Sequence, residues 1–326
     1  MKRVTILGTG SYAPEKILTN AELEKMVDTT DEWITQRTGI KERHISDKDT
    51  PTSVLAIKAA ERALAAAKVK PEELDFILCA TVTPDMVFPS VACLVQAALG
   101  ATKAAALDIS AGCTGFIYGM EVARSMVMSD PGRKILLIGA EELTKITDWT
   151  DRSSCILFGD GAGAVVLGAT EGERGILSTF LGADGNLGDL IYQPGGGSLR
   201  PASHETVDGK MHVIRMAGNK VFPHAVRKMG DAATKALEAA GVTQDQLDVL
   251  IPHQANFRII DAIGRHLNLP MEKVYVNIDR YGNTSSASIP IALDEAVRNG
   301  RITPGKYVML VAFGAGLTWG AVLIRW

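Results

Sequence analysis

The stretch that decides the fold is Ala-Leu-Ala-Ala-Ala-Lys-Val at residues 63–69, because it recurs as Ala-Leu-Glu-Ala-Ala-Gly-Val at residues 236–242. Each copy is followed in the same register by Leu-Asp and an apolar run, at 74–78 and at 247–251. Self-similarity at one long period indicates a duplicated domain, whereas solenoid repeats have much shorter periods. The chain is therefore predicted to contain two related halves.

Two further pairs of motifs support the duplication. Phe-Gly-Asp-Gly at 158–161 and Phe-Gly-Ala-Gly at 313–316 each lead into an apolar run. Gly-Cys-Thr at 112–114 aligns with Gly-Asn-Thr at 282–284. In a pseudo-twofold arrangement, equivalent strand ends from the two halves would face one another. We therefore expect a site to which both halves contribute.

Strand-like and helix-like segments alternate along the chain. The expected helices lie at 20–27, 31–38, 53–68, 91–99, 116–128, 218–240, 257–267 and 288–299, and the expected strands at 4–7, 134–139, 164–168, 247–251, 274–278, 307–312 and 321–324. This alternation implies an α/β fold with five layers of helix, sheet, helix, sheet and helix. One half is expected to span 1–172 and the other 173–326, with the Gly- and Pro-rich stretch 184–209 as a surface excursion or lid near the boundary.

Composition excludes several classes of function. The 326 residues are 46% hydrophobic and 22% charged, and the net charge of −3 argues against nucleic-acid binding through a basic surface. No signal peptide or long apolar span is visible, so no membrane association is expected. Four widely spaced cysteines without a C-x-x-C pair argue against zinc and disulfides, and favour a reducing cytoplasm. Gly8 and Gly10 are interpreted as a tight turn, because Pro14 interrupts the helix that a nucleotide loop needs.

Cys113 is the first candidate for catalysis. It lies in Asp-Ile-Ser-Ala-Gly-Cys-Thr-Gly-Phe at 108–116, where a helix is expected to begin. A helix N-terminus favours a thiolate, which is the nucleophilic form of cysteine. Taken alone, a buried structural cysteine is the commoner explanation.

His253 and Asn283 change that balance. His253 stands in Ile-Pro-His-Gln-Ala-Asn at 251–256, and Asn283 in Tyr-Gly-Asn-Thr-Ser-Ser at 281–286. Like Cys113, each follows a predicted strand, and open α/β sheets bind ligands at that edge. Singly, His253 would be interpreted as a core histidine and Asn283 as a turn residue.

With these motifs in place, the chain resembles the thiolase-fold condensing enzymes, and most closely the β-ketoacyl-acyl carrier protein synthase III family. The resemblance covers essentially the whole chain and includes Thr-Asp-Glu-Trp-Ile at 30–34, Arg-Thr-Gly-Ile at 37–40 and Phe-Gly-Ala-Gly-Leu-Thr-Trp-Gly at 313–320. A Cys-His-Asn set separates this group from thiolases, which use a second cysteine, and from elongating synthases, which use two histidines.

The resemblance implies a two-step reaction without a cofactor or metal. An acyl-CoA primer, often acetyl-CoA, acylates Cys113. Malonyl-acyl carrier protein then loses carbon dioxide, and its carbanion attacks the acyl-cysteine, which initiates fatty-acid synthesis. His253 and Asn283 would stabilise the malonyl oxyanion. The backbone N–H groups of Cys113 and Ala315 would hold the second oxyanion; Ala315 stands where many relatives have glycine.

Substrate-binding residues are also implied by the resemblance. Trp33 would stack on the CoA adenine with Arg37 and Arg152 beside the nucleotide. The pantetheine channel would be lined by Gly218, Phe222 and Asn256. Without the family match, these would be interpreted as a core tryptophan, solvated arginines and ordinary helix residues.

Two protein partners are implied as well. Phe88 would enter a primer pocket across a homodimer interface. The acyl carrier protein is acidic, and residues 209–230 contain no acid and five basic side chains, Lys210, Arg215, Lys220, Arg227 and Lys228. Together with Gln254 and Arg258, Lys220 of this run would form the docking patch. A solvated charged face is the plainer alternative.

Four other functions remain open on the sequence. They are a paralogous synthase that primes polyketide, quinolone or long-chain products, a hydroxymethylglutaryl-CoA synthase, a cysteine hydrolase, and a non-catalytic acyl-CoA- or carrier-binding protein. The last would be expected to lack the nucleophile, yet Cys113, His253 and Asn283 are all present.

Overall fold

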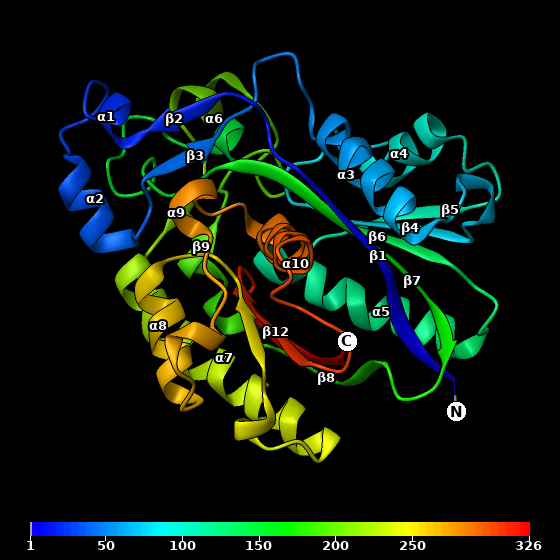
Figure 1. Ribbon diagram of the computed structural model, residues 1–326. Coiled ribbons are helices and arrows are strands. Elements are labelled where there is room, and N and C mark those ends of the chain that lie inside the picture. The colour runs from blue at the N-terminus through cyan, green and yellow to red at the C-terminus, as the bar shows by residue number, and fades with distance from the viewer. Residues whose placement is uncertain (1) are drawn as a thin grey trace.

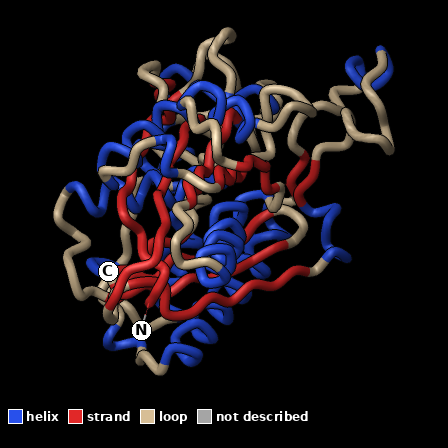
Figure 2. The backbone as a smooth tube through the Cα atoms, turned by 90° about the vertical axis from the view of Figure 1, so that its right-hand side faces the viewer, coloured by secondary structure: helices blue, strands red, loops and turns tan. Residues whose placement is uncertain are grey.

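Two mixed β-sheets form the frame of the molecule, which is described by a computed structural model for residues 2–326 (Figures 1 and 2). The first sheet has the order β1 (Lys2–Tyr12), β7 (Asp160–Glu171), β6 (Ile135–Glu142), β4 (Phe76–Ala80) and β5 (Ala105–Ile109). The second has the order β11 (Val249–Pro252), β12 (Tyr307–Gly314), β13 (Thr318–Arg325) and β8 (Gly175–Ala183).

The strand directions confirm the duplication that the repeat predicted. In the first sheet β4 and β6 are parallel, whereas β7 runs antiparallel to both β6 and β1. In the second, β11 and β12 are parallel, whereas β13 runs antiparallel to both β12 and β8. The four strands β1, β7, β6 and β4 therefore correspond to β8, β13, β12 and β11.

Helices form three layers around these sheets. The outer face of the first sheet is covered by α3 (Thr52–Ala67) and α4 (Val91–Leu99), and that of the second by α7 (Gly218–Ala240) with α8 (Phe257–His266) beside it. Helices α5 (Gly115–Ser129) and α10 (Ser288–Arg298) lie between the sheets and share one apolar core with both (Figure 1). The expected five-layer α/β architecture is thus confirmed.

The smaller elements surround this core. They are β2 (Ile17–Thr19), α1 (Asn20–Leu23), α2 (Asp31–Thr38), β3 (Glu42–His44), β9 (Ile191–Tyr192), α6 (His204–Asp208), β10 (Arg215–Met216) and α9 (Ile278–Tyr281). The expected excursion at 184–209 contains a 3₁₀ turn, β9 and α6, and the pairing of β9 with β10 returns it to the fold. None of the helices within residues 2–326 is long and apolar enough to cross a membrane.

The expected turn at Gly8 and Gly10 is wrong, because both residues lie within the long strand β1. A Cβ on Gly8 would stand 2.3 Å from the backbone nitrogen of Ala67, and one on Gly10 would stand 2.3 Å from that of Ala63. The two glycines therefore let helix α3 approach the strand more closely than any side chain would permit.

The strand expected at 274–278 is reduced to a single bridge between Leu250 and Val274. The side chain of Gln254 supplies the physical reason. Its Oε1 accepts hydrogen bonds from the N–H groups of Asn277 (3.0 Å) and Ile278 (3.2 Å). These two N–H groups therefore cannot pair with a neighbouring strand, and the chain continues into helix α9.

Candidate active site

Cys113 lies in a 3₁₀ turn, Gly112–Thr114, between strand β5 and helix α5. The turn packs against the loop that joins β12 to β13. A Cβ on Gly314 would stand 2.6 Å from the backbone nitrogen of Cys113, and one on Gly112 would stand 2.9 Å from that of Ala315. The two backbone nitrogens predicted to form an oxyanion hole therefore belong to segments in direct contact.

The hydroxyl of Thr318 holds these segments together. Its oxygen lies 2.6 Å from that of the Thr114 hydroxyl, and its single proton can be donated to the carbonyl of Ala315 (2.9 Å) or of Ala111 (3.2 Å). Thr114 follows the cysteine directly, and Thr318 begins the last strand. The cysteine turn is thus fixed to the C-terminal half by side chains as well as by close backbone packing.

The expectation of a resting Cys113 thiolate is not met. The residue keeps partial solvent access, but the protein atoms around its sulfur desolvate it, and this burial raises the pKa of the thiol to about 12. The nearby hydroxyl of Ser285 acts in the opposite direction, and the Glu141 carboxylate raises the pKa further. At neutral pH the resting nucleophile is therefore a thiol.

His253 follows strand β11 and is buried, with only 3% of its surface exposed. The backbone N–H of His253 donates to the carbonyl of Val311 (2.8 Å), and the ring Nδ1 lies 2.7 Å from the hydroxyl oxygen of Ser288. The same oxygen also accepts from the backbone N–H of Gln254 (3.4 Å). Burial lowers the pKa of His253 to about 3, so the ring is neutral. The tautomer with its proton on Nε2 is the one in which Nδ1 accepts from the Ser288 hydroxyl.

Asn283 lies at the start of the segment that leads into α10. The backbone N–H of Asn283 donates to the carbonyl of Leu157 (2.8 Å), and its backbone carbonyl accepts from the N–H of Gly159 (3.0 Å). Its side-chain Oδ1 accepts from the N–H of Ser285 at 2.9 Å. This bond fixes the orientation of the amide and leaves the Nδ2 protons as donors to other groups.

One short segment, residues 283–288, relates the three candidates to one another. It begins with Asn283, its Ser285 hydroxyl influences the Cys113 thiol, and its last residue, Ser288, holds the ring of His253. Its 3₁₀ turn packs directly on the turn that carries Cys113. The cysteine turn of one half and the histidine of the other therefore both contact this segment, which itself carries Asn283.

Trp33 lies between two arginines. In α2 the guanidinium of Arg37 stands 4.7 Å from the centroid of the tryptophan ring, and that of Arg152 stands 4.6 Å from it. Arg152 also pairs with the exposed carboxylate of Asp28 (3.2 Å). A planar aromatic ring with two cations is suited to a nucleotide, which presents both a flat base and phosphates.

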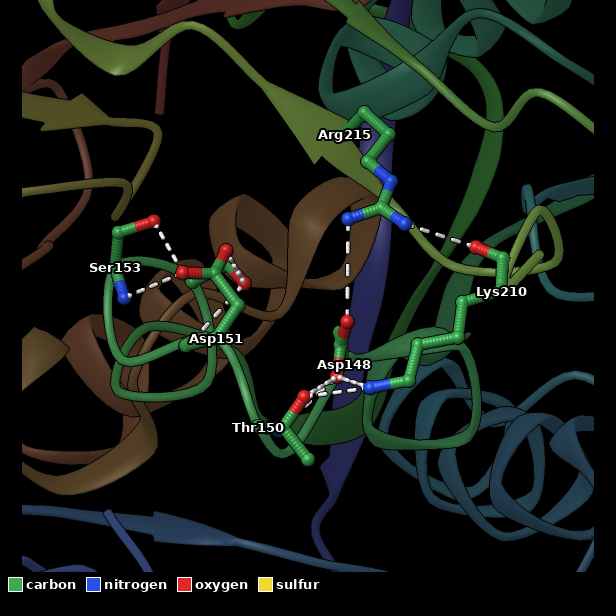
Figure 3. Close-up of polar contacts among 7 residues, drawn as sticks. Asp148, Thr150, Asp151, Ser153, Lys210 and Arg215 are labelled. Carbon is green, nitrogen blue, oxygen red and sulfur yellow. Dashed lines mark hydrogen bonds and ion pairs between the residues drawn. The ribbon is translucent and has the colours of Figure 1, made fainter. Parts of the chain in front are cut away.

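The loop that carries Arg152 is held by two aspartates (Figure 3). Asp151 accepts from the N–H and hydroxyl of Ser153. Asp148 pairs with Lys210 (3.4 Å) and Arg215 (3.9 Å), both from the basic run at 209–230. The single charge of Asp148 therefore offsets part of the positive charge of these two residues.

Other members of the basic run differ in their surroundings. Lys228 lies over the ring of Trp319 at 4.2 Å. Lys220 and Arg227 are exposed, and no ion pair is found for either within residues 2–326. The exposed Arg258 stands 5.5 Å from the ring of Phe222. Two of these exposed cations, Lys220 and Arg258, thus lie at the starts of α7 and α8, and Arg227 lies further along α7.

Gln254 does not belong to this surface, and its expected place in partner docking is wrong. Only 1% of its surface is exposed, and its amide nitrogen donates to the carbonyls of Pro252 (2.8 Å) and Tyr275 (3.2 Å). With its oxygen engaged as well, the side chain is an internal brace that supports His253.

The residues expected to line a channel lie at the junction of α2, α7 and α8. Asn256 caps α8 by accepting from the N–H of Arg258 (2.9 Å), and its amide donates to the carbonyl of Arg37 (3.0 Å). Gly218 is the first residue of α7, and Phe222 lies one turn further on. Asn256 thus connects the Trp33 cluster to the strand end that carries His253.

Phe88 lies on a surface loop and does not belong to the hydrophobic core of the chain. Its side chain is 82% exposed and its neighbour Val87 is 86% exposed.

Residues 2–326 contain no cluster of three or more potential metal ligands among His, Cys, Asp and Glu. The sequence reasoning missed Ser285, Ser288 and Glu141; the only available indication was a pair of adjacent acids shortly after the predicted strand at 134–139.

Comparison with known proteins identifies the family. Residues 107–185 match the family described as 3-oxoacyl-[acyl-carrier-protein] synthase III, and residues 237–326 match its C-terminal domain. The β-ketoacyl-[acyl-carrier-protein] synthase III of Caldanaerobacter subterraneus subsp. tengcongensis is 59% identical, over 98% of this chain and 97% of the relative. That of Desulfitobacterium hafniense strain Y51 is 56% identical, over 100% and 98%.

Solved structures agree. The 3-oxoacyl-[acyl-carrier-protein] synthase III from Aquifex aeolicus superposes with a TM-score of 0.92 at 50% identity, covering 99% of this chain and 100% of that one. The priming β-ketosynthase from the R1128 polyketide pathway also gives 0.92, at 35% identity over 99% and 96%. This chain, with its duplicated thiolase-like fold, belongs to the β-ketoacyl-[acyl-carrier-protein] synthase III family of acyl-transferring condensing enzymes.

Proposed function

We propose that the protein condenses an acyl-CoA primer, such as acetyl-CoA, with malonyl-acyl carrier protein to initiate fatty-acid synthesis. The observation that carries the proposal is the meeting of Cys113, a neutral His253 and an oriented Asn283 around residues 283–288. The high sequence identity to relatives named β-ketoacyl-[acyl-carrier-protein] synthase III supports the same reaction.

In the first half-reaction the Cys113 sulfur attacks the thioester carbonyl of the acyl-CoA. The carbon–sulfur bond to CoA breaks, and the thiol proton leaves with CoA as its free thiol. Because the resting thiol has a raised pKa, its deprotonation coincides with binding and attack rather than preceding them. The N–H groups of Cys113 and Ala315 hold the oxyanion of the tetrahedral intermediate.

In the second half-reaction malonyl-acyl carrier protein loses carbon dioxide, and the electrons of the broken bond move onto its thioester oxygen. The Nε2 proton of His253 and the Nδ2 protons of Asn283 are donated to that oxygen. A neutral imidazole with its proton on Nε2 can donate to that oxygen while its Nδ1 accepts from the Ser288 hydroxyl. The resulting carbanion attacks the acyl-cysteine, and the sulfur departs and regains a proton.

For the CoA substrate we propose binding of the nucleotide at Trp33, Arg37 and Arg152. Both guanidinium groups already lie within 5 Å of the ring, so one of them would move aside to let the adenine stack. Asn256, Gly218 and Phe222 would then line the path of the pantetheine arm toward His253.

For the carrier we propose docking at the exposed cations Lys220 and Arg258, at the starts of α7 and α8. The carrier is acidic as a class, and rim charges of opposite sign accelerate association. Lys210 and Arg215 contribute less, because they share the negative charge of Asp148.

We also propose a homodimer. Strand β5 is one of the two edge strands of the first sheet and exposes Leu107 to 41%, and the nearby loop exposes Val87 and Phe88. An apolar edge strand of this kind needs a cover, and a second copy of β5 supplies one that also brings Phe88 to the partner's acyl pocket. Light scattering should give twice the mass of the chain, and Leu107→Lys should shift it toward the monomer.

The reaction itself is tested by reconstitution. The protein is mixed with an acyl-CoA and malonyl-acyl carrier protein, and the carrier is analysed by mass spectrometry. A β-ketoacyl carrier supports the proposal, and an unchanged malonyl carrier in the presence of an active reference synthase contradicts it. The likeness to a polyketide-priming synthase makes the primer the open variable, so a panel of straight and branched acyl-CoAs separates the two pathways. We also propose that the protein acts in the cytoplasm, because its four cysteines are free thiols, as expected in a reducing compartment.

A further inference from the structure

Glu141, next to last in strand β6, is a buried acid that the reaction scheme does not use. None of its surface is exposed. Its Oε1 accepts hydrogen bonds from the hydroxyls of Ser285 (3.0 Å) and Ser286 (2.9 Å). Its Oε2 accepts from three groups at the end of β4, namely the N–H of Val82 (3.0 Å) and the hydroxyls of Thr81 (3.2 Å) and Thr83 (2.8 Å).

The first of these partners, Ser285, has an unusual backbone. Its φ angle is +47°, in the left-handed region that residues with a Cβ seldom occupy. Such a conformation persists only where the surroundings impose it. The hydrogen bond from the Ser285 hydroxyl to Glu141, which is itself held by β4, is a contact of this kind.

The left-handed conformation decides where the Ser285 N–H points. It donates to Asn283 Oδ1 at 2.9 Å. While the oxygen of the amide is occupied in this way, the nitrogen must face the other side. A released amide could rotate and present its oxygen to the developing enolate, where it would repel the negative charge.

We propose that Glu141 is a positioning residue for Asn283. It tethers the Ser285 hydroxyl, keeps Ser285 left-handed, and so holds the Asn283 NH₂ group toward the thioester oxygen of the malonyl unit. The chain of contacts runs from the first sheet through Glu141 and Ser285 to Asn283. The inference rests on the proposed function of Asn283 in decarboxylation.

A matched pair of variants at position 285 tests the tether. Both Ser285→Ala and Ser285→Gly remove the hydroxyl, so any direct effect of that hydroxyl on the Cys113 sulfur is the same in both. Glycine adopts a positive φ freely, whereas alanine does not. We expect carbon dioxide release from malonyl-carrier to fall about 10-fold or more in Ser285→Ala, within the range for loss of one oxyanion donor, and to stay within about threefold of wild type in Ser285→Gly.

Variants of Glu141 complete the test. Glu141→Ala should slow carbon dioxide release as Ser285→Ala does, and adding Ser285→Gly should restore much of the loss. Glu141→Gln should retain more activity than Glu141→Ala, because the serine hydroxyls can turn to accept from its amide. A purely structural role would instead lower acylation of Cys113 and decarboxylation together, with no rescue by glycine.

The Asn283→Ala background separates the possible failures. In that background Ser285→Ala should slow decarboxylation no further, because the residue to be positioned is gone. Equal activity of the alanine and glycine variants at 285, or a further loss in the Asn283→Ala background, would overturn the positioning role. Normal decarboxylation in Asn283→Ala alone would overturn the function proposed for that asparagine, and the positioning role with it.

Discussion

The neutral state of His253 has a measurable consequence for stability. The ring is 3% exposed, and burial lowers its pKa to about 3, whereas an unfolded histidine titrates near its ordinary value of about 6.5. The perturbation we consider is His253→Gln. Its amide oxygen can still accept the hydrogen bond from Ser288, but it does not titrate.

The sign and size of the effect follow from linkage. A histidine whose folded pKa is lowered contributes stability that is fully present above its unfolded pKa and is lost as the pH falls toward the folded pKa. Between pH 6.5 and pH 3 the unfolded chain binds one more proton than the folded one. Each pH unit in this window therefore costs about 1.4 kcal/mol, or about 2.7 kcal/mol between pH 6.5 and pH 4.5.

The assay is urea unfolding of wild type and His253→Gln at pH 7.5, 5.5 and 4.5, at equal protein concentration. All other titrating groups are shared, so only the difference between the two curves matters. The free energy of unfolding should fall more steeply in wild type, by about 2 to 3 kcal/mol at pH 4.5 relative to pH 7.5. Parallel losses in the two proteins would refute the reasoning, since the folded ring would then accept a proton as readily as the unfolded one.

The remaining predictions concern the two half-reactions. Cys113→Ala should abolish acyl labelling by acyl-CoA, as read by intact mass, and labelling that persists at an unchanged rate would refute the assignment. Asn283→Ala should slow carbon dioxide release roughly 100- to 1,000-fold while sparing acylation; normal release with failed acylation would reverse the proposed roles. Lys220→Glu with Arg258→Glu should slow condensation with the carrier, reduce its dependence on salt, and leave acylation unchanged. An equal loss in both half-reactions would instead point to misfolding or to damage at the CoA site.

Much of the fold could be predicted from the sequence because its determinants are local or repeated. Helix α2 begins at Asp31 and ends at Thr38, as its pattern predicts, with Thr30 as its N-cap. The two copies of the Ala-Leu repeat predict the equivalent helices α3 and α7, and strand-to-helix alternation predicts the layers. The turn at Cys113 before α5 was likewise visible in its small residues.

The errors share a physical cause, which is that packing between distant segments decided the outcome. Gly8 and Gly10 lie in a strand against which a helix from a distant part of the chain packs closely, as the 2.3 Å approaches to Ala67 and Ala63 show. The segment after Val274 fails to pair because Gln254, buried beneath it, takes its backbone donors.

The site shows the same division between residue identity and environment. A helix start at Cys113 was predictable, but the raised pKa of its thiol depends on how completely the folded chain excludes water from the sulfur. Glu141 is one of two adjacent acids after a predicted strand, and nothing in the sequence says that five donors from two halves of the molecule converge on it.

The most direct test of the central claim follows one acyl group through both half-reactions. The protein is incubated with labelled acyl-CoA, freed of excess substrate, digested to locate the label, and then mixed with malonyl-acyl carrier protein. The account predicts one acyl group on Cys113, followed by its transfer to the carrier as a β-ketoacyl thioester with release of one carbon dioxide. A label on another residue, or a Cys113 acyl group released as free acid while the malonyl carrier remains intact, would contradict it.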